Sequence, residues 1–132
     1  AHAGDLHFVV TARCENYLRN RPDLAATIAR LQSFQEAGAD VLYAPGITDP
    51  GDIRSLVASV DRPVNVLAMP SVPPVEDLAA AGVARVSVGS ALANVALGAV
   101  VQAACELKKR GTYAFWSLAA EGSTAARSAF RT

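Results

Sequence analysis

Cysteine and histidine are scarce in this chain, with two of each among 132 residues. Cys14 and Cys105 lack the close spacing that metal sites built from cysteine require, so we expect free thiols and no metal held by this chain. Free thiols are typical of a reducing compartment, and the first six residues lack the basic and apolar regions of a secretory signal. Both observations predict a cytoplasmic protein.

Net charge is also absent, because 12 basic residues balance 12 acidic ones. Without a long-range field of one sign, we expect no nucleic-acid partner and no membrane partner, and any anion must be bound by local side chains. The most apolar stretch, residues 91–105, is interrupted by Asn94 and Gln102 and is shorter than the ~20 residues of a bilayer span. It is therefore predicted to be a core helix.

Apolar residues make up 52% of the chain, and their spacing alternates four times between that of a strand and that of a helix. The predicted strands are residues 8–13, 40–44, 64–68 and 84–88, and the helices that follow them are residues 23–37, 50–60, 75–81 and 91–110. These units form one predicted domain, residues 1–111. Residues 112–132 are predicted to be a C-terminal tail with an aromatic docking segment and a partly disordered end.

Repeated strand and helix units predict an α/β fold with a parallel sheet and right-handed crossovers. An open sheet with helices on both faces would have almost continuously apolar strands. Here, polar residues share one face within their strands: Thr11 and Arg13, Asn65, and Arg85 and Ser87. This pattern favours the interior of a TIM (β/α)8 barrel, and because a complete barrel takes about 250 residues, the chain is predicted to form half of one.

Arg13 is the leading candidate for a site residue. It ends the apolar strand that starts at Phe8, and the carboxyl ends of parallel strands form the ligand-binding face of such folds. A guanidinium group at that position is suited to binding an anion. An alternative role is an ion pair with Glu15, which shares its face of the strand, and the two roles are compatible.

Four segments carry a resemblance to a known family. They are Phe8–Tyr17 (FVVTARCENY), Glu36–Gly46 (EAGADVLYAPG), Arg62–Ala68 (RPVNVLA) and Arg85–Gly89 (RVSVG). In this order they resemble strands five to eight of the isocitrate lyase/phosphoenolpyruvate mutase superfamily, over residues 6–116. The resemblance implies the C-terminal half of a TIM barrel. It also implies part of a magnesium-dependent lyase, mutase or hydrolase that acts on small 2-oxo or 2-hydroxy acids through enolate-like intermediates.

The same resemblance implies roles for individual residues. Arg13 matches the family's arginine that binds substrate carboxylate or phosphonyl oxygens, and Glu15 replaces a common aspartate. Asn65 and Ser87 are further candidate substrate-binding residues on the interior face, although Asn65 could equally satisfy polar groups inside the barrel. Residues 44–46 lack the glutamate or histidine that several members carry there. The magnesium ligands and the catalytic lysine or cysteine are expected outside this chain, and Cys14 is expected to pack under a helix.

Two residues, Ser90 and Tyr43, each have two possible roles. Ser90, after Gly89, could hold a phosphate at a helix start or be an ordinary N-cap. Tyr43 could point into the barrel or belong to the core, whereas His2 and His7 are expected to be solvated.

Three hypotheses therefore stay open. The first is part of a lyase or mutase-type enzyme, inactive as this chain alone, that binds a small anionic metabolite and associates with the other half of the barrel or with itself as a homo-oligomer. The second is a non-catalytic half-barrel or oligomerisation module. The third is a small open-sheet domain that binds an anionic metabolite.

Overall fold

The computed structural model describes residues 8–130, so the predictions for His2 and His7 lie outside the described residues. Its contacts divide the chain into two compact units, and the division along the sequence lies between Gly89 and Ser90. We call them the sheet unit and the helical unit and describe each by itself. The predicted division of the chain after residue 111 stays a prediction, and that position is the C-cap of a helix in the helical unit.

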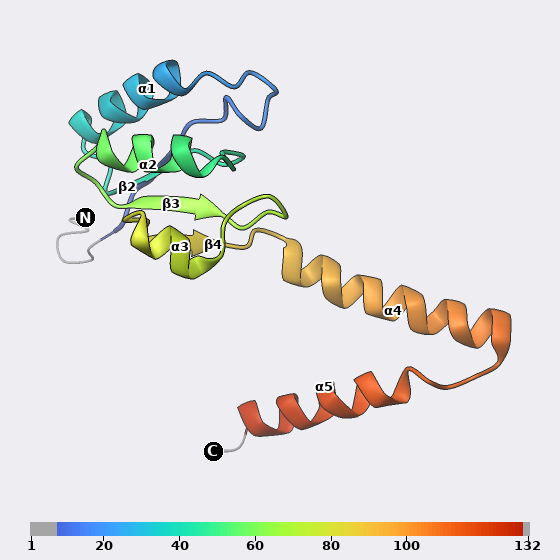
Figure 1. Cartoon of the computed structure of the whole chain (residues 1–132). Helices are drawn as coiled ribbons and strands as arrows, with labels where there is room; N and C mark the ends of the chain where they lie inside the picture. The colour runs from blue at the N-terminus through green and yellow to red at the C-terminus, as the bar shows by residue number, and fades with distance from the viewer. Residues whose placement is uncertain (1–7, 131–132) are drawn as a thin grey trace, which may run out of the picture. The chain divides into compact units, whose positions relative to one another are not determined.

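The sheet unit contains the predicted alternation of strands and helices (Figure 1). Its elements are β1 (Thr11–Arg13), α1 (Leu24–Glu36), β2 (Val41–Tyr43), α2 (Pro50–Ala58), β3 (Val64–Leu67), α3 (Val75–Ala80) and β4 (Arg85–Ser87). The first strand begins at Thr11, later than predicted, because its pairing with β2 starts at Thr11 and Val41. The Val10 carbonyl nevertheless accepts hydrogen bonds from the backbone N–H groups of Asp40 and Val41.

Short polar residues start the two long helices of this unit. The Asp23 side chain accepts a hydrogen bond from the N–H of Ala26, and the Asp49 side chain accepts from those of Gly51 and Asp52. Such caps satisfy backbone donors that have no partner inside the helix. Gly38 follows α1 with a φ of 98°, a conformation that glycine adopts at little cost.

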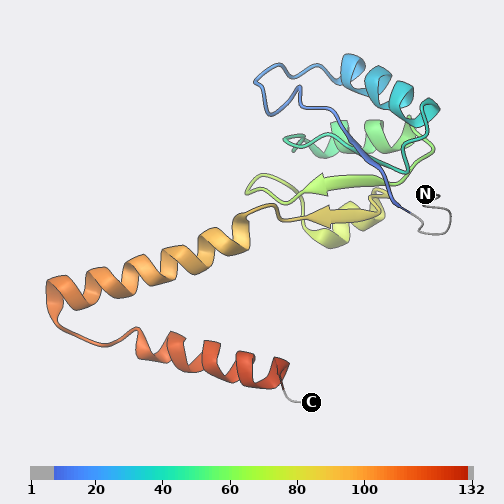
Figure 2. The same cartoon turned by 180° about the vertical axis from the view of Figure 1, so that it is seen from behind.

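The four strands form one parallel sheet in the order β1-β2-β3-β4. Figures 1 and 2 show that α1, α2 and α3 follow one another across the sheet in the order of their strands. A single cluster of buried side chains joins the three helices to the sheet, with Leu31 from α1, Ile53 and Leu56 from α2, and Leu78 from α3. Within the sheet unit, the helices therefore cover one face, and that unit by itself is not an open sheet with helices on both faces.

The core lies between that face and the helices. Leu42 and Val66 from the central strands are fully buried in it, together with Leu31 and Leu56 from the helices. Burying an aliphatic side chain of this size stabilises a fold by roughly 1.5–3 kcal/mol. Cys14 also belongs to this core, which confirms the prediction that it packs under a helix. The opposite face of the sheet is left for the polar residues.

The helical unit consists of α4 (Ala91–Arg110) and α5 (Trp116–Ala129). The turn between them is held by Glu106, whose carboxylate accepts hydrogen bonds from the Thr112 hydroxyl at 2.6 Å and the Ala114 N–H at 2.8 Å. These two hydrogen bonds lower the pKa of Glu106, because they favour its ionised form. The prediction of a partly disordered tail is wrong up to Ala129, because α5 is helical to that residue.

The prediction of a core helix at residues 91–105 is also wrong within the helical unit, because α4 has no buried residue. The backbone hydrogen bonds of α4 form within the helix itself, but within the helical unit its large apolar side chains stay exposed. By length and composition α4 could also cross a membrane. That criterion carries little weight for a single helix, since the core helix of a soluble protein meets it as well.

Candidate functional site

Polar side chains from all four strands lie on the face of the sheet that the helices leave open. Cross-strand pairing places Arg13 beside Tyr43, Tyr43 beside Asn65, and Asn65 beside Arg85. One residue of each strand thus lies at the same level, and Ser87 follows two positions after Arg85. Because neighbouring strands bring paired residues to the same face, a row of side chains crosses the sheet. We call Arg13, Tyr43, Asn65, Arg85 and Ser87 the polar row.

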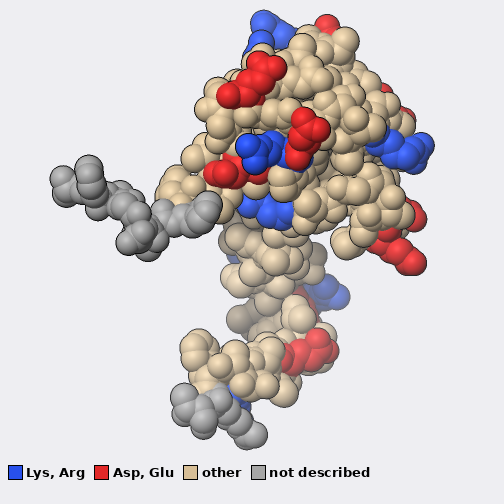
Figure 3. All heavy atoms as spheres, turned by 90° about the vertical axis from the view of Figure 1, so that its left-hand side faces the viewer, with Lys and Arg blue, Asp and Glu red and all other residues tan. Residues whose placement is uncertain are grey.

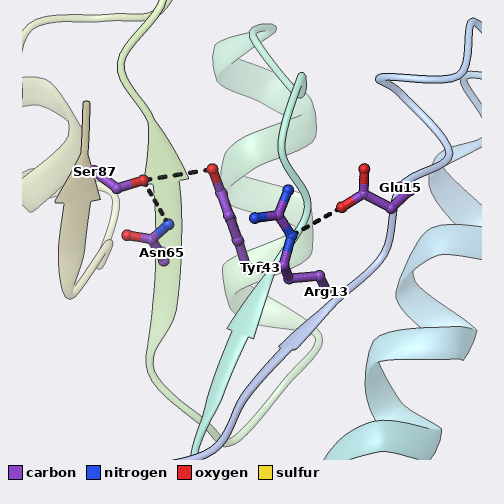
Figure 4. A network of polar contacts seen from close by, with 5 residues as sticks. All are labelled: Arg13, Glu15, Tyr43, Asn65 and Ser87. Carbon is purple, nitrogen blue, oxygen red and sulfur yellow. Dashed lines mark hydrogen bonds and ion pairs between the residues drawn. The ribbon is translucent and has the colours of Figure 1, made fainter. Parts of the chain in front are cut away.

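Arg13 stands at one end of the polar row, at the carboxyl end of β1. Its Nε donates to Oε1 of Glu15 at 2.8 Å, and its Cζ lies 4.9 Å from the centre of the Tyr43 ring (Figure 4). The two charged side chains are 52% and 40% exposed, so the ion pair contributes little stability by itself, about 0–1 kcal/mol. Within residues 8–130, this bond from Nε is the only hydrogen bond of the guanidinium. Its two terminal amino groups are therefore free to bind an anion.

The rest of the polar row is joined by hydrogen bonds. Ser87 donates to the Tyr43 hydroxyl oxygen at 3.4 Å, a long bond, and accepts from Asn65 Nδ2 at 3.0 Å (Figure 4). Asn65 Oδ1 accepts from Arg85 Nε at 2.9 Å. Asn65 is fully buried, and both ends of its amide are engaged, as a buried amide requires. The network links β2, β3 and β4 through their side chains.

The loop that follows Arg13 is fastened to the neighbouring loop after β2. Gly46 has a φ of 93°, and a Cβ atom on it would lie 3.1 Å from Tyr17 Cβ and 3.2 Å from the Leu18 backbone nitrogen. The Tyr17 hydroxyl donates to Asp52 at 3.2 Å. Burial, followed by the nearby charge of Asp52, raises the pKa of Tyr17 to about 12. Close packing and this hydrogen bond thus determine the path of the chain that carries Glu15.

The structure brings the four predicted site residues, Arg13, Glu15, Asn65 and Ser87, into this one region, while their role in substrate binding stays a prediction. Sequence reasoning placed Arg85 on the polar face but did not count it among the candidate site residues, and it left the role of Tyr43 open. Tyr43 is buried, with 7% of its surface exposed, and it contacts Arg13 and Ser87; whether it points into a barrel stays a prediction. The signal for Arg85 was present, since it shares its face of the strand with Ser87.

Ser90 does not join the polar row. It precedes α4, in the helical unit, and its side chain forms no hydrogen bond to the first backbone N–H groups of that helix. Its hydroxyl instead accepts from Asn94 Nδ2 at 3.3 Å. The expected N-cap position is therefore correct, but the capping bond is not formed.

Residues 8–130 contain no group of three or more His, Cys, Asp or Glu side chains that could hold a metal ion. Hard cations such as Mg²⁺ prefer several oxygen ligands, often from carboxylates, and Glu15 of this region is already paired with Arg13. The described residues therefore do not fit a metal centre by themselves. On the face drawn in Figure 3, acidic and basic side chains are interspersed, in keeping with the balanced charge of the chain.

A sequence model of the family described as phosphoenolpyruvate phosphomutase matches residues 1–108. The chain is also 38% identical to an uncharacterised protein of Mycobacterium tuberculosis, over 72% of this chain and 37% of that protein. Among solved structures, a candidate lyase/mutase of Burkholderia cenocepacia is 50% identical with a TM-score of 0.87, over 95% of this chain and 46% of that one.

A more distant likeness concerns the fold alone. The crystal structure of 2,3-dimethylmalate lyase, a member of the PEP mutase/isocitrate lyase superfamily, matches 91% of this chain and 47% of its own, with 21% identity and a TM-score of 0.68. This chain thus spans less than half of the length of each of these proteins.

Proposed function

Because the chain belongs to the phosphoenolpyruvate phosphomutase family, within the predicted PEP mutase/isocitrate lyase superfamily, we propose that it is part of a lyase or mutase for small 2-oxo or 2-hydroxy acids. In this proposal Arg13 binds a carboxylate or phosphonyl group of the substrate. The observation that carries it is the geometry of Arg13. Nε is held by Glu15, the Tyr43 ring lies against the guanidinium, and the terminal amino groups remain available.

A guanidinium group held in this way suits the proposed task. Its terminal amino groups can donate two parallel hydrogen bonds to one carboxylate or phosphonate, and such charge-assisted pairs are stronger than bonds between neutral groups. Lysine presents a point charge and does not reproduce this geometry. Asn65 and Ser87 would add neutral hydrogen-bonding groups to the same face of the sheet, where they are already fixed by each other.

We further propose that β1 to β4 are strands five to eight of a TIM barrel. Three observations support this: the strands pair in chain order, the helices cover one face, and the open face carries the polar row. In a barrel the open face is the interior, and the carboxyl ends of the strands surround the active site. The other strands, and the ligands of a magnesium ion that would stabilise an enolate-like intermediate, would lie outside this chain.

Association with further strands or with a second copy belongs to the same proposal. In the described sheet β1 and β4 each have one partner strand, so each presents an unpaired edge. In the helical unit, α4 exposes several large apolar side chains, including Leu92, Val95 and Val100. Exposed apolar surface of this extent is typical of an interface. We propose a homo-oligomeric cytoplasmic enzyme that binds neither nucleic acid nor membrane.

The decisive experiment compares Arg13→Lys with Arg62→Lys in the purified protein in its native assembly. Arg62 is exposed and precedes β3, at the opposite end of the strands from the site. Lyase and mutase turnover of small 2-oxo and 2-hydroxy acids is measured with Mg²⁺. Loss of one charge-assisted hydrogen bond predicts that Arg13→Lys lowers kcat/KM about 10- to 100-fold, while Arg62→Lys leaves it unchanged.

Two results would contradict the proposal. Equal activity in both variants would show that Arg13 does not bind the substrate. A defined homo-oligomer that contains only the 13.7 kDa chain and turns over none of these acids would favour the alternative, a non-catalytic half-barrel module. Denatured mass spectrometry together with light scattering identifies that case.

A further inference from the structure

We propose that Tyr43 is the positioning residue for Arg13, and that its ring and its hydroxyl group have separate tasks. This inference rests on the proposed function, because it explains how the anion-binding guanidinium is kept in place. Neither the fold nor the comparisons assign Tyr43 a role. The evidence is the contact between its ring and Arg13, combined with the network that holds its hydroxyl group.

The ring supports one face of the guanidinium. Arg13 and Tyr43 are paired across β1 and β2, and the Arg13 Cζ lies 4.9 Å from the ring centre. An arginine side chain is long and flexible, so a half-exposed one samples many rotamers unless neighbours restrict it. Glu15 holds only Nε, which leaves rotation about that contact. The ring removes this freedom, since a cation is attracted to the face of an aromatic ring.

The hydroxyl group holds the ring. Tyr43 is almost completely buried, and its hydroxyl oxygen accepts a hydrogen bond from Ser87. Ser87 is in turn fixed by Asn65, whose amide oxygen is occupied by Arg85. The orientation of the ring is therefore set by side chains of β3 and β4, two strands that are not paired with β1. Through this chain of contacts, Ser87 and Asn65 influence the Arg13 guanidinium indirectly, by way of the Tyr43 ring.

This arrangement has a consequence for selectivity. With the ring against one face of the guanidinium and Glu15 on Nε, an anion has access to the edge formed by the two terminal amino groups. Two oxygens that lie in the plane of that edge accept parallel hydrogen bonds. A carboxylate meets this condition readily because its two oxygens are equivalent. Loss of the ring would open the face and allow other approach directions.

The test uses Tyr43→Leu and Tyr43→Phe in the protein in its native assembly, with Tyr113→Leu as the matched control. Tyr113 is 62% exposed and lies in the helical unit. The first measurement is the NMR chemical shift of the Arg13 Nε–H group without any ligand, assigned through Arg13→Lys. A ring face held against the guanidinium shifts this resonance. We expect Tyr43→Phe to keep most of the shift, Tyr43→Leu to lose it, and Tyr113→Leu to leave it unchanged.

The second measurement is a titration with oxalate as a probe dicarboxylate. Loss of the ring face should weaken oxalate binding about 2- to 5-fold in Tyr43→Leu, the effect of one exposed cation–π contact, and Tyr43→Phe should restore most of it. A role for Tyr43 in core packing alone would not produce rescue by phenylalanine together with a change at Arg13. Equal Nε–H shifts in wild type and Tyr43→Leu would overturn the proposal, whether or not oxalate binds.

Ser87→Ala keeps the inference testable if Tyr43→Leu fails to fold. It leaves the ring in place and removes the bond to the hydroxyl group, so we expect the Nε–H shift to decrease without disappearing. An unchanged shift would show that the network does not hold the ring. If Arg13 does not bind the substrate anion, the result is different. Oxalate binding would then be equal in wild type and Arg13→Lys, while the Nε–H shift of Arg13 without ligand would still report on the contact with Tyr43.

Discussion

The sheet unit and the helical unit use similar residues with opposite results. Both are rich in leucine, valine and alanine, and both form regular helices. Yet Leu56 of α2 is 1% exposed, whereas Leu97 of α4 is 62% exposed. In the sheet unit each helix has a sheet face to cover. In the helical unit, α4 and α5 reach helical structure without burying a single residue.

The difference teaches that local structure and burial are separate steps. A helix forms when its backbone hydrogen bonds and caps are satisfied, but most of the stability of protein helices comes from packing of an apolar face. The sheet unit supplies that packing within the described chain. Within the helical unit the apolar side chains of α4 and α5 are not buried, which is why we propose that this unit associates with another chain or segment.

The largest expected contrast is between two leucine truncations. Leu56→Ala should destabilise the sheet unit by about 2–5 kcal/mol, because it leaves a cavity in a packed core. Leu97→Ala should change the stability of the helical unit by less than about 0.5 kcal/mol, because it removes an exposed side chain. Urea unfolding at low protein concentration, followed by hydrogen exchange and mass spectrometry, separates the units. Equal losses would show that α4 is packed, and a larger loss for Leu97→Ala at high concentration would reveal association.

Two replacements of glycine by alanine should change the stability of the protein in opposite directions. Gly46→Ala should destabilise by about 1–3 kcal/mol, because alanine is strained at a φ of 93° and its methyl group would crowd Tyr17. Gly122→Ala should stabilise α5 by about 0.5–1 kcal/mol, since a Cβ atom added at Gly122 would have no neighbouring atom within 4 Å and alanine is the better helix former. Trp116, the only tryptophan, reports on α5 by fluorescence. Two effects of the same sign would contradict this contrast.

The two helix starts provide a smaller contrast. Asp49→Ala should cost about 1 kcal/mol, because it leaves the N–H groups of Gly51 and Asp52 without their cap. Ser90→Ala should cost less than about 0.5 kcal/mol, because its side chain forms no capping bond. Thermal unfolding of both variants tests this. Similar losses would mean that Ser90 caps α4 in solution.

The smallest expected contrast is between the two units in how their stability depends on pH. The pKa of Tyr17 is raised to about 12 in the folded state. The stabilisation of the folded state by the protonated Tyr17 is therefore complete below pH 10 and is lost as the pH rises toward 12. The pKa of Glu106 is lowered in the folded state from its usual value of 4.5. The stabilisation of the folded state by the ionised Glu106 is therefore present above pH 4.5 and is lost as the pH falls below it.

Hydrogen exchange should therefore show the loop after β1 loosening in alkali and the turn after α4 loosening in acid. Tyr17→Phe should remove the alkaline effect, and Glu106→Gln the acid effect. Tyr113→Phe, on an exposed side chain, serves as the control for the first. A wild-type alkaline profile that matches that of Tyr17→Phe would contradict the role given to the Tyr17 hydroxyl.

Much of the sheet unit could be predicted from sequence. The alternation of strand and helix, the ends marked by Asp23, Gly38 and Asp49, and the burial of Cys14 all depend on local patterns. The shared face of Arg13, Asn65 and Ser87 followed from the two-residue period of a strand. The contact of Tyr43 with Arg13 did not follow, because it depends on the register between two strands, which local patterns leave open.

The sequence by itself determined the strands and helices of the sheet unit, the family and the residue types that can bind an anion. The strands, the helices and the family resemblance depend on the order and spacing of residues within short segments, which the sequence states directly. Only the tertiary structure decided that the helices cover one face, that the polar row crosses the other, and that α4 has no buried residue. Burial and side-chain contact are properties of pairs of distant segments, so they are decided only when the strands pair and the helices pack.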